Sequence, residues 1–429
     1  MISPGSTTPA VSSSLSVESA ASLGTTLSRV TFCSSNVSSE SLQSVVESCS
    51  SLLTLATETL FLVGTGALGM LSVLQRGETS ELIKYAALMT GGTMLLLLLT
   101  SGGGRERRTR RSTERLVVIV TGCDSGLGFN IAKLCLSLGF TVFAGCLNKD
   151  SEGSRLLQEQ DGTTGRLFIE QLNITLEEHV LVANKSVKTF LEQNPDYELY
   201  ALINNAGVMC FGEFEWQLNA HFEQQVDVNV IGTMRVTKSF LPMLRRYRAR
   251  LINVTSHCAL QALPGLSVYS ATKAALHFWT DGLRMEMSNY GVPVVNFIPG
   301  SLVMQSNICA NQMRYAAEMK SAFSAEQLEF YGSYFDEYNG YLKFISGAKP
   351  VQCLPKDHPV LKRFEDALLD ESPSRIYKCE PWRYRLYHLL FRITPTVIRD
   401  WLVRRFVSMP LYRSPEKLKG NMAAQNMPN

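Results

Sequence analysis

A hydroxyl, a phenol and an amine stand at spacings that suit proton transfer. Ser256 comes just after the apolar run 251–254, and Tyr269 and Lys273 follow it at thirteen and seventeen positions. A step of four residues places Tyr269 and Lys273 on one face of a helix. A phenol titrates near ~10, and a neighbouring ammonium favours the phenolate, so we expect Lys273 to lower the pKa of Tyr269. With Ser256 orienting a substrate oxygen, this set suits the interconversion of an alcohol and a carbonyl.

The residues that position a redox cofactor should come earlier in the chain. Residues 116–120 (LVVIV) form a continuous β-branched run, which is typical of a central parallel strand. The glycine-rich stretch 121–128 (TGCDSGLG) follows, and residues 129–138 have a helical pattern. A strand, a glycine turn and a helix in this order predict a dinucleotide site, with the pyrophosphate at the helix N-terminus.

These segments resemble the short-chain dehydrogenase/reductase family. The resemblance rests on the Ser-Tyr-x-x-x-Lys set, on the TGxxxGxG spacing and on the Asn-Asn-Ala-Gly segment 204–207. It implies an α/β fold, a Rossmann-type doubly wound parallel sheet with a helical substrate lid. It also implies a catalytic set of Asn229, Ser256, Tyr269 and Lys273. In that set Tyr269 is the acid or base, Lys273 also binds the nicotinamide ribose, and Asn229 holds a water of the proton relay.

The same resemblance implies the residues that contact the cofactor. They fall in the glycine-rich turn and in the loops that follow the other strands: Thr121, Gly122, Asp124, Ser125, Gly126, Leu127, Gly128, Asn148, Asn173, Ile174, Asn205, Ala206, Gly207, Tyr269, Lys273, Pro299, Gly300 and Ser301. After Pro299-Gly300 the family often supplies a Thr to the nicotinamide carboxamide, and here only Ser306 is available for that contact.

The choice between NAD and NADP depends on the residues near the adenosine ribose. The strand predicted at 141–146 should end there, where an acid marks NAD and a base favours NADP. Asn148 and Lys149 give an ambiguous signal. The carboxylate of Asp124 would repel a ribose phosphate, which favours NAD and leaves NADP open. Asn173 replaces the family's acid, and its amide can still bond the exocyclic amine of adenine.

An aromatic insert follows the sixth predicted strand, at residues 305–349. Eight of its aromatic residues suit a large, flat, apolar ligand better than a small acid: Phe323, Phe330, Tyr331, Tyr334, Phe335, Tyr338, Tyr341 and Phe344. His257 follows Ser256 and either hydrogen-bonds a distal polar group of the substrate or caps the strand.

Further likenesses within the family narrow the substrate. The segments TGCDSGLGF and FAGCLNKDSEG resemble hydroxybutyrate, retinol and hydroxysteroid dehydrogenases. ALINNAGVMCFGEFEWQ, NVTSHCALQALPG and VVNFIPGS resemble more closely an insect branch that acts in ecdysteroid hormone biosynthesis. This implies a sterol alcohol or ketone as substrate, and the family implies a homodimer or homotetramer. A retinoid or hydroxy-acid dehydrogenase and a cofactor-binding scaffold without turnover are the alternatives.

The first hundred residues differ from the rest. Residues 1–50 are rich in serine, and we expect disorder there. Residues 51–104 contain the apolar runs 59–74 and 82–100, which predict a membrane anchor of one or two spans. The basic linker 105–115 holds six arginines and two glutamates, so the positive-inside rule places the following domain in the cytosol. We expect this anchor to lie in the endoplasmic reticulum membrane.

The remaining chain divides into the Rossmann core 116–304, the substrate lid 305–374, basic-aromatic helices at 375–413 and a disordered tail at 414–429. A net charge of +3 does not indicate nucleic acid. Residues 375–419 carry eleven basic and three acidic residues among aromatic ones, which favours an anionic membrane surface. The ten cysteines form no CxxC pair, so we expect reduced thiols, including buried Cys123, Cys135 and Cys146, and no metal site.

Overall fold

The computed structural model describes residues 112–162, 164–407 and 409–412. The predicted disordered segment 1–50, the predicted anchor 51–104, residues 105–111 of the basic linker and the tail 414–429 lie outside these residues. Within the described ranges, no helix combines the length and the apolar character needed to cross a membrane.

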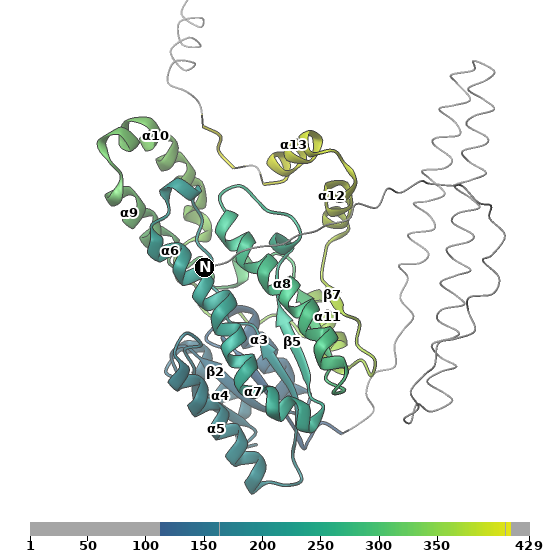
Figure 1. Cartoon of the computed structure of the whole chain (residues 1–429). Coiled ribbons are helices and arrows are strands. Elements are labelled where there is room, and N and C mark those ends of the chain that lie inside the picture. Colours follow the sequence, from purple (N-terminus) through teal and green to yellow (C-terminus); the bar gives the residue numbers. More distant parts are fainter. Residues whose placement is uncertain (1–111, 163, 408, 413–429) are drawn as a thin grey trace, which may run out of the picture. The chain divides into compact units, whose positions relative to one another are not determined.

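Seven parallel strands form one sheet in the order β3-β2-β1-β4-β5-β6-β7 (Figure 1). Their bounds are β1 Leu116–Thr121, β2 Thr141–Cys146, β3 Leu167–Gln171, β4 Glu198–Asn204, β5 Arg250–Val254, β6 Val294–Ile298 and β7 Ile376–Lys378. The doubly wound parallel sheet predicted from the sequence is confirmed. The strand β7 was not predicted, because its three residues lie among basic and aromatic residues that indicate helices.

Helices cover both faces of the sheet, which explains why the central strands are apolar throughout. One face packs against α3 (Gly126–Ser137), α4 (Glu152–Asp161) and α11 (Pro359–Leu369). The other packs against α5 (Glu177–Gln193), α7 (Thr233–Tyr247) and α8 (Ser267–Ser288). Helix α11 lies in the range predicted as lid, but its Phe364 is fully buried in the core under the sheet. Three thiols of this core are buried and free, as expected: Cys123, Cys135 and Cys146.

Two pairs of helices lie beyond the carboxyl ends of the strands (Figure 1). The helices α9 (Gln312–Ala322) and α10 (Ala325–Leu342) pack around the buried indole of Trp216. The helices α12 (Trp382–Ile393) and α13 (Thr396–Val407) pack against each other through aromatic rings. Because the strand order reverses between β1 and β4, a crevice opens at the carboxyl ends of these strands.

Candidate active site

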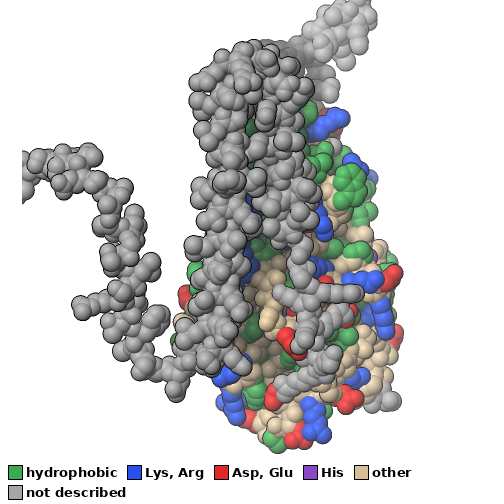
Figure 2. All heavy atoms as spheres, turned by 90° about the vertical axis from the view of Figure 1, so that its right-hand side faces the viewer, with side chains coloured by type: hydrophobic (Ala, Val, Ile, Leu, Met, Phe, Trp, Pro, Cys, Tyr) green, Lys and Arg blue, Asp and Glu red, His purple; other side chains and the backbone are tan. Residues whose placement is uncertain are grey.

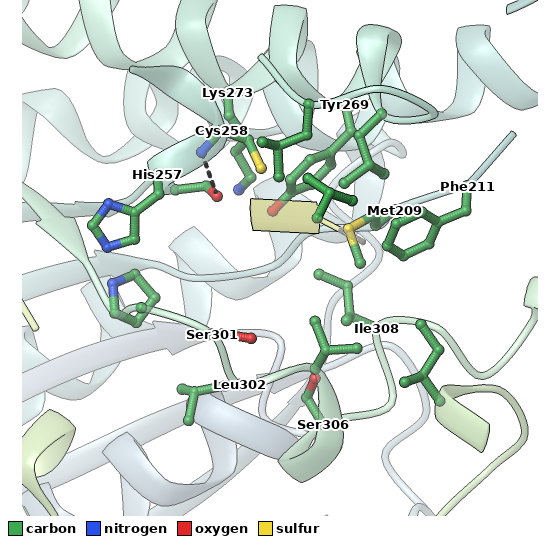
Figure 3. A pocket seen from close by; sticks show the side chains of 18 of the residues that line it. Met209, Phe211, His257, Cys258, Tyr269, Lys273, Ser301, Leu302, Ser306 and Ile308 are labelled. Carbon is green, nitrogen blue, oxygen red and sulfur yellow. Dashed lines mark hydrogen bonds between the residues drawn. The ribbon is translucent and has the colours of Figure 1, made fainter. Parts of the chain in front are cut away.

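Three of the four predicted catalytic residues face one cavity of about 540 Å³. Ser256 enters it from the end of β5, and Tyr269 and Lys273 enter it from the first turns of α8. Figure 3 shows the Tyr269 hydroxyl directed into this cavity, between Met209 and the loop that carries Cys258. The strand end and the helix together bring a serine hydroxyl, a phenol and an amine to one volume, as the sequence spacing predicts.

The amine of Lys273 is buried beside the phenol. Its Nζ lies 5.9 Å from the centre of the Tyr269 ring and donates a hydrogen bond of 3.2 Å to the Val254 carbonyl. The hydrogen bond anchors the amine to the last residue of β5. The side chains are 6% and 4% exposed for Tyr269 and Lys273, so both groups are nearly removed from water.

Burial changes the acidity of these two groups in the direction opposite to the sequence expectation. Burial raises the pKa of the Tyr269 phenol, followed by the field of Cys258, while a hydrogen bond with Ser256 lowers it in part. The pKa of the Tyr269 phenol is therefore raised overall, where the sequence predicts a lowered value. Burial also lowers the pKa of Lys273 to about 8. Burial thus favours the protonated phenol, which is the form that can donate a hydrogen bond to a carbonyl oxygen.

The shifted amine gives the activity an alkaline limit. Lys273 is an ammonium below its pKa of about 8 and loses this charge as the pH rises through that value. Since the ammonium stabilises negative charge on the phenol oxygen, kcat/KM should fall as the pH rises through about 8. Arginine stays charged over this pH range. The activity that the Lys273→Arg variant retains should therefore not decrease as the pH rises. A wild-type profile that stays flat to a pH of about 10 would contradict this role.

Asn229 is fully buried in the single turn of π-helix η2 (Asp227–Gly232). Its Oδ1 accepts a hydrogen bond from the Val208 N–H at 2.8 Å, and its Nδ2 donates to the Val208 carbonyl at 2.9 Å and to Thr272 Oγ1 at 3.0 Å. The amide therefore ties the loop after β4 to α8. A Cβ on Gly207 would lie 3.2 Å from its Oδ1 and 3.4 Å from Lys273 Nζ. This neighbourhood agrees with the relay role, which stays a prediction.

A second cavity of about 630 Å³ adjoins the first. The two share five lining residues: Leu127, Asn205, Gly207, Ser306 and Ile308. Most of the predicted cofactor contacts line one or both: Gly122, Asp124, Ser125, Gly126, Leu127, Asn173, Ile174, Asn205, Ala206, Gly207, Tyr269, Lys273, Pro299, Gly300 and Ser301. The two cavities thus form a continuous cleft that joins the glycine-rich turn to the Tyr269 phenol.

Three predicted contacts do not line either cavity. The Thr121 hydroxyl accepts hydrogen bonds from the backbone N–H groups of Asn205 and Ala206 at 3.0 and 3.1 Å, so it braces the turn from behind. Gly128 packs against the Gly122 carbonyl. Asn148 is held through its backbone N–H by Asp124. These residues shape the cleft without facing it.

Asp124 and Asn173 use their side-chain oxygens inside the protein. The Asp124 carboxylate accepts from the backbone N–H groups of Leu147 and Asn148 at 2.8 and 2.9 Å, which places its charge at the end of β2. The Asn173 Oδ1 accepts from both the N–H and the hydroxyl of Thr175, at 3.1 and 2.9 Å. Both lone pairs of that oxygen are engaged, which argues against the expected bond to the adenine amine.

Aromatic rings form part of the wall of the cavity that holds Tyr269. Several of these rings come from a region that the sequence did not predict to contact the substrate. Of the nine aromatic residues of the insert, Tyr315 included, only Tyr341 and Phe344 line this cavity. Tyr334, Phe335 and Tyr338 are buried around Trp216 instead. The helices α12 and α13 supply five further lining residues, four of which carry rings: Tyr384, His388, Phe391, Phe406 and Val407. Their aromatic pattern was visible in the sequence, where it indicated a membrane surface.

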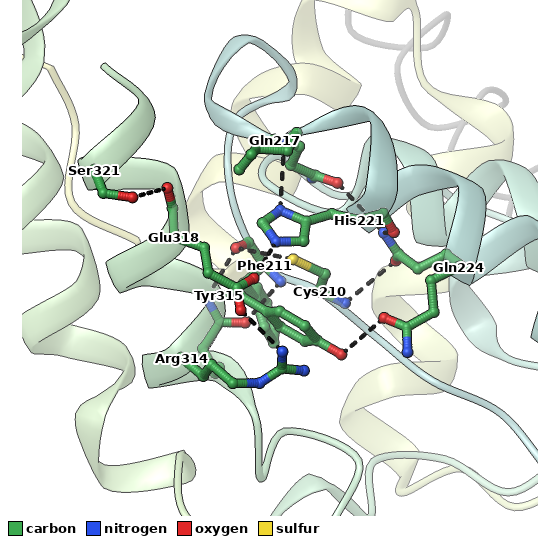
Figure 4. A network of polar contacts seen from close by, with 12 residues as sticks. Cys210, Phe211, Gln217, His221, Gln224, Arg314, Tyr315, Glu318 and Ser321 are labelled. Atoms are coloured by element: carbon green, nitrogen blue, oxygen red, sulfur yellow. Dashed lines mark hydrogen bonds and ion pairs between the residues drawn. The ribbon is translucent and has the colours of Figure 1, made fainter.

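The lid helix α9 is fastened beside the cavity by buried polar contacts (Figure 4). His221, on helix α6 (Asn219–Val226), lies 2.8 Å from the Glu318 carboxylate through its Nε2. The side chain of Gln312 exchanges two hydrogen bonds of 2.9 Å with the backbone of Phe211. These bonds hold the lid against the loop that carries Met209 and Phe211 into the cavity.

A model of the family described as short chain dehydrogenase matches residues 116–313 of the chain. Three curated relatives cover larger parts of it. Mitochondrial D-beta-hydroxybutyrate dehydrogenase of Rattus norvegicus is 38% identical over 51% of this chain, which spans 65% of that enzyme. Estradiol 17-beta-dehydrogenase 2 of Mus musculus is 33% identical over 70% of this chain and 77% of its own. Retinol dehydrogenase 7 of Mus musculus is 31% identical over 66% of this chain and 86% of its own.

Proposed function

The chain belongs to the short-chain dehydrogenase family of oxidoreductases, and we propose that it transfers a hydride between NAD and a sterol alcohol or ketone. The observation that carries this proposal is that Ser256, Tyr269 and Lys273 meet in a cavity continuous with the glycine-lined cleft. The resemblance to an insect branch of the family adds that the step belongs to ecdysteroid formation.

The glycine-rich turn fits a dinucleotide. Gly122 and Gly126 have φ of 73° and 60°, and a Cβ on Gly122 would lie 2.9 Å from Ala206 Cα. Ser125 precedes α3 without a capping side-chain bond, and the first turn of α3 has no acidic residue. The first N–H groups of α3 therefore remain available to a diphosphate. The charge of Asp124 at the end of β2 supports NAD over NADP, since it would repel a ribose phosphate.

The chemistry divides between the cofactor and the side chains. The bound nicotinamide supplies or accepts the hydride. The Tyr269 hydroxyl gives its proton to the carbonyl oxygen in the reducing direction and takes it back in the other. The Ser256 hydroxyl holds the same oxygen in place, and Lys273 stabilises negative charge on the phenol while the proton moves.

The lining of the catalytic cavity favours an apolar substrate over a hydroxy acid. Aliphatic and aromatic side chains make up most of its wall. Among the described residues that line it, Lys273 is the only lysine or arginine, and it is held by the Val254 carbonyl. A substrate carboxylate would therefore lack a cationic partner of its own, which is costly in a buried site. The relatives named for estradiol and retinol agree with an apolar substrate.

A substrate panel tests this proposal. The purified full-length protein is assayed in both directions with NAD and with NADP against sterols, retinol and 3-hydroxybutyrate. We expect a sterol with NAD to give a kcat/KM at least ten-fold above every other pair. A preference for retinol or hydroxybutyrate would overturn the substrate class, and cofactor binding without turnover on any substrate would favour the scaffold.

Membrane association is the second part of the proposal, and it rests on the outer face of α12 and α13. Trp382, Val397 and Trp401 are 74%, 82% and 63% exposed, and arginines lie between them. Figure 2 faces the right-hand side of Figure 1 and shows hydrophobic side chains beside basic ones in the upper part of the described surface. Exposed tryptophans with arginines suit an anionic bilayer surface. The same helices line the cavity, so an apolar substrate would enter from the lipid.

Quenching of tryptophan fluorescence by brominated lipids measures this contact at named positions. The chain has four tryptophans, and Trp382 and Trp401 should be quenched on vesicles of phosphatidylcholine with phosphatidylserine. Salt should weaken the effect, since it screens the arginines. The Trp382→Ser/Trp401→Ser variant retains buried Trp216 and half-buried Trp279, whose emission should be unaffected. Equal quenching in this variant would contradict the proposed surface.

The endoplasmic reticulum as location, a cytosolic catalytic domain, and a homodimer or homotetramer stay predictions.

A further inference from the structure

Two imidazoles converge on one carboxylate at the side of the catalytic cavity. His257 lies in the turn η3 (His257–Ala259) directly after Ser256, Glu380 follows β7, and His388 lies on α12. His257 Nδ1 and His388 Nδ1 are 3.1 and 3.2 Å from the same oxygen, Glu380 Oε1. The three side chains are 15%, 8% and 14% exposed, so water can satisfy them only in part.

Only one of the two histidines of this cluster is hydrogen-bonded to the carboxylate. His388 Nδ1 is hydrogen-bonded to the Glu380 carboxylate. The short contact of His257 with that carboxylate lacks the alignment of a hydrogen bond, and neither ring nitrogen of His257 has a hydrogen-bond partner among the described residues. A buried polar atom without a partner destabilises the folded protein. A third group that binds an imidazole nitrogen would remove this cost.

We propose that His257, Glu380 and His388 bind a divalent transition-metal ion, of which Zn²⁺ fits best. The candidate ligand atoms all lie within 4.8 Å of one another. Zn²⁺ bonds to imidazole nitrogen and carboxylate oxygen are about 2.0–2.2 Å long, so neighbouring ligands of a tetrahedral ion lie about 3.3 Å apart. The two nitrogen–oxygen distances are close to this value. Two histidines and one glutamate are a ligand set that zinc accepts while keeping a fourth position for water or substrate.

The surroundings define which ions can compete. Lys378 acts on both His257 and Glu380 and opposes a bound cation, so a weakly held ion such as Mg²⁺ is disfavoured. The imidazoles stack with ring centres 4.3 Å apart and planes at 23°, and binding requires a small rotation of the rings. Both rings line the catalytic cavity, which gives the ion an entry path. An ion here would tie the loop after Ser256 to α12 and fix that helix over the substrate.

The metal content of the untagged full-length protein tests the site. After purification and equilibration with a chelator-buffered Zn²⁺ solution, elemental analysis should find about one zinc per chain. Glu380→Gln and His388→Ala should each weaken zinc binding on the order of 100-fold or more, since each removes a direct ligand. His358→Ala, outside the cluster, is the control. Two ligand variants are used so that a failure of one to fold leaves the other.

A thermal readout separates a specific site from loose binding. Zn²⁺ should raise the Tm of the wild type and of His358→Ala, because an ion that binds only the folded state stabilises it. It should not raise the Tm of the ligand variants. Equal zinc content in wild type and both ligand variants, or no zinc in the wild type, would overturn the site. Neither readout depends on turnover, so these outcomes do not bear on the proposed dehydrogenase activity.

Discussion

Tyr269→Phe should lower kcat/KM by about 10²- to 10⁴-fold, which is the range that a positioned acid or base contributes. The substitution removes one oxygen and keeps the ring, which packs in the buried cluster of the lid. The dissociation constant of NAD should change little, because the nucleotide cleft is formed chiefly by the glycine-rich turn and the loop after β4. Stopped-flow measurement of hydride transfer and titration calorimetry with NAD separate the two effects.

Tyr338→Phe provides the matched control for this experiment. Tyr338 is also a buried phenol, at 2% exposure, and its hydroxyl has no hydrogen-bond partner in the part of the chain that the structure describes. It does not line the catalytic cavity. Its variant should therefore retain wild-type turnover. Activity retained in Tyr269→Phe, or lost equally in both variants, would remove Tyr269 from the proton-transfer step.

The meeting of Ser256, Tyr269 and Lys273 in one cavity could be predicted because their geometry is local. A four-residue helical step joins Tyr269 to Lys273, and Ser256 follows a buried run whose carboxyl end must open into the crevice of a parallel sheet. Burial is the property that the spacing could not supply. Desolvation raises the pKa of the Tyr269 phenol, where the sequence predicted a fall, and lowers the pKa of Lys273.

The cavity wall could not be predicted, because it depends on packing between distant segments. Tyr338 and Phe335 belong to an aromatic insert, and the sequence does not tell which rings face a ligand and which pack on Trp216. His388 is more than a hundred residues from His257 in the chain, and its ring stacks on that histidine through the fold alone. At Asn173 the contact is local and was still missed. Its Oδ1 accepts hydrogen bonds from the N–H and the hydroxyl of Thr175, whereas the resemblance implied a bond between the Asn173 side chain and adenine.

At Gly128, beside the cofactor cleft, any side chain would clash with the backbone of the glycine-rich turn. A Cβ on Gly128 would lie 2.1 Å from the Gly122 carbonyl oxygen and 2.4 Å from Asn205 Nδ2. That Nδ2 donates hydrogen bonds to the carbonyls of Thr121 and Gly122 at 3.0 and 3.2 Å. Gly128→Ala must therefore push α3 away from the turn and disturb bonds that hold the loop after β4.

The expected result of Gly128→Ala is a loss of about 2–3 kcal/mol in the free energy of unfolding, as for other overpacked sites, and a NAD affinity at least ten-fold weaker. Urea unfolding and calorimetry measure the two quantities. Gly282→Ala is the control on α8, since a Cβ there meets nothing within 4 Å. It should stabilise the protein by about 0.5–1 kcal/mol, because alanine is the better helix former. If both variants kept the NAD affinity of the wild type, this result would contradict the glycine-rich turn as the binding site of the cofactor.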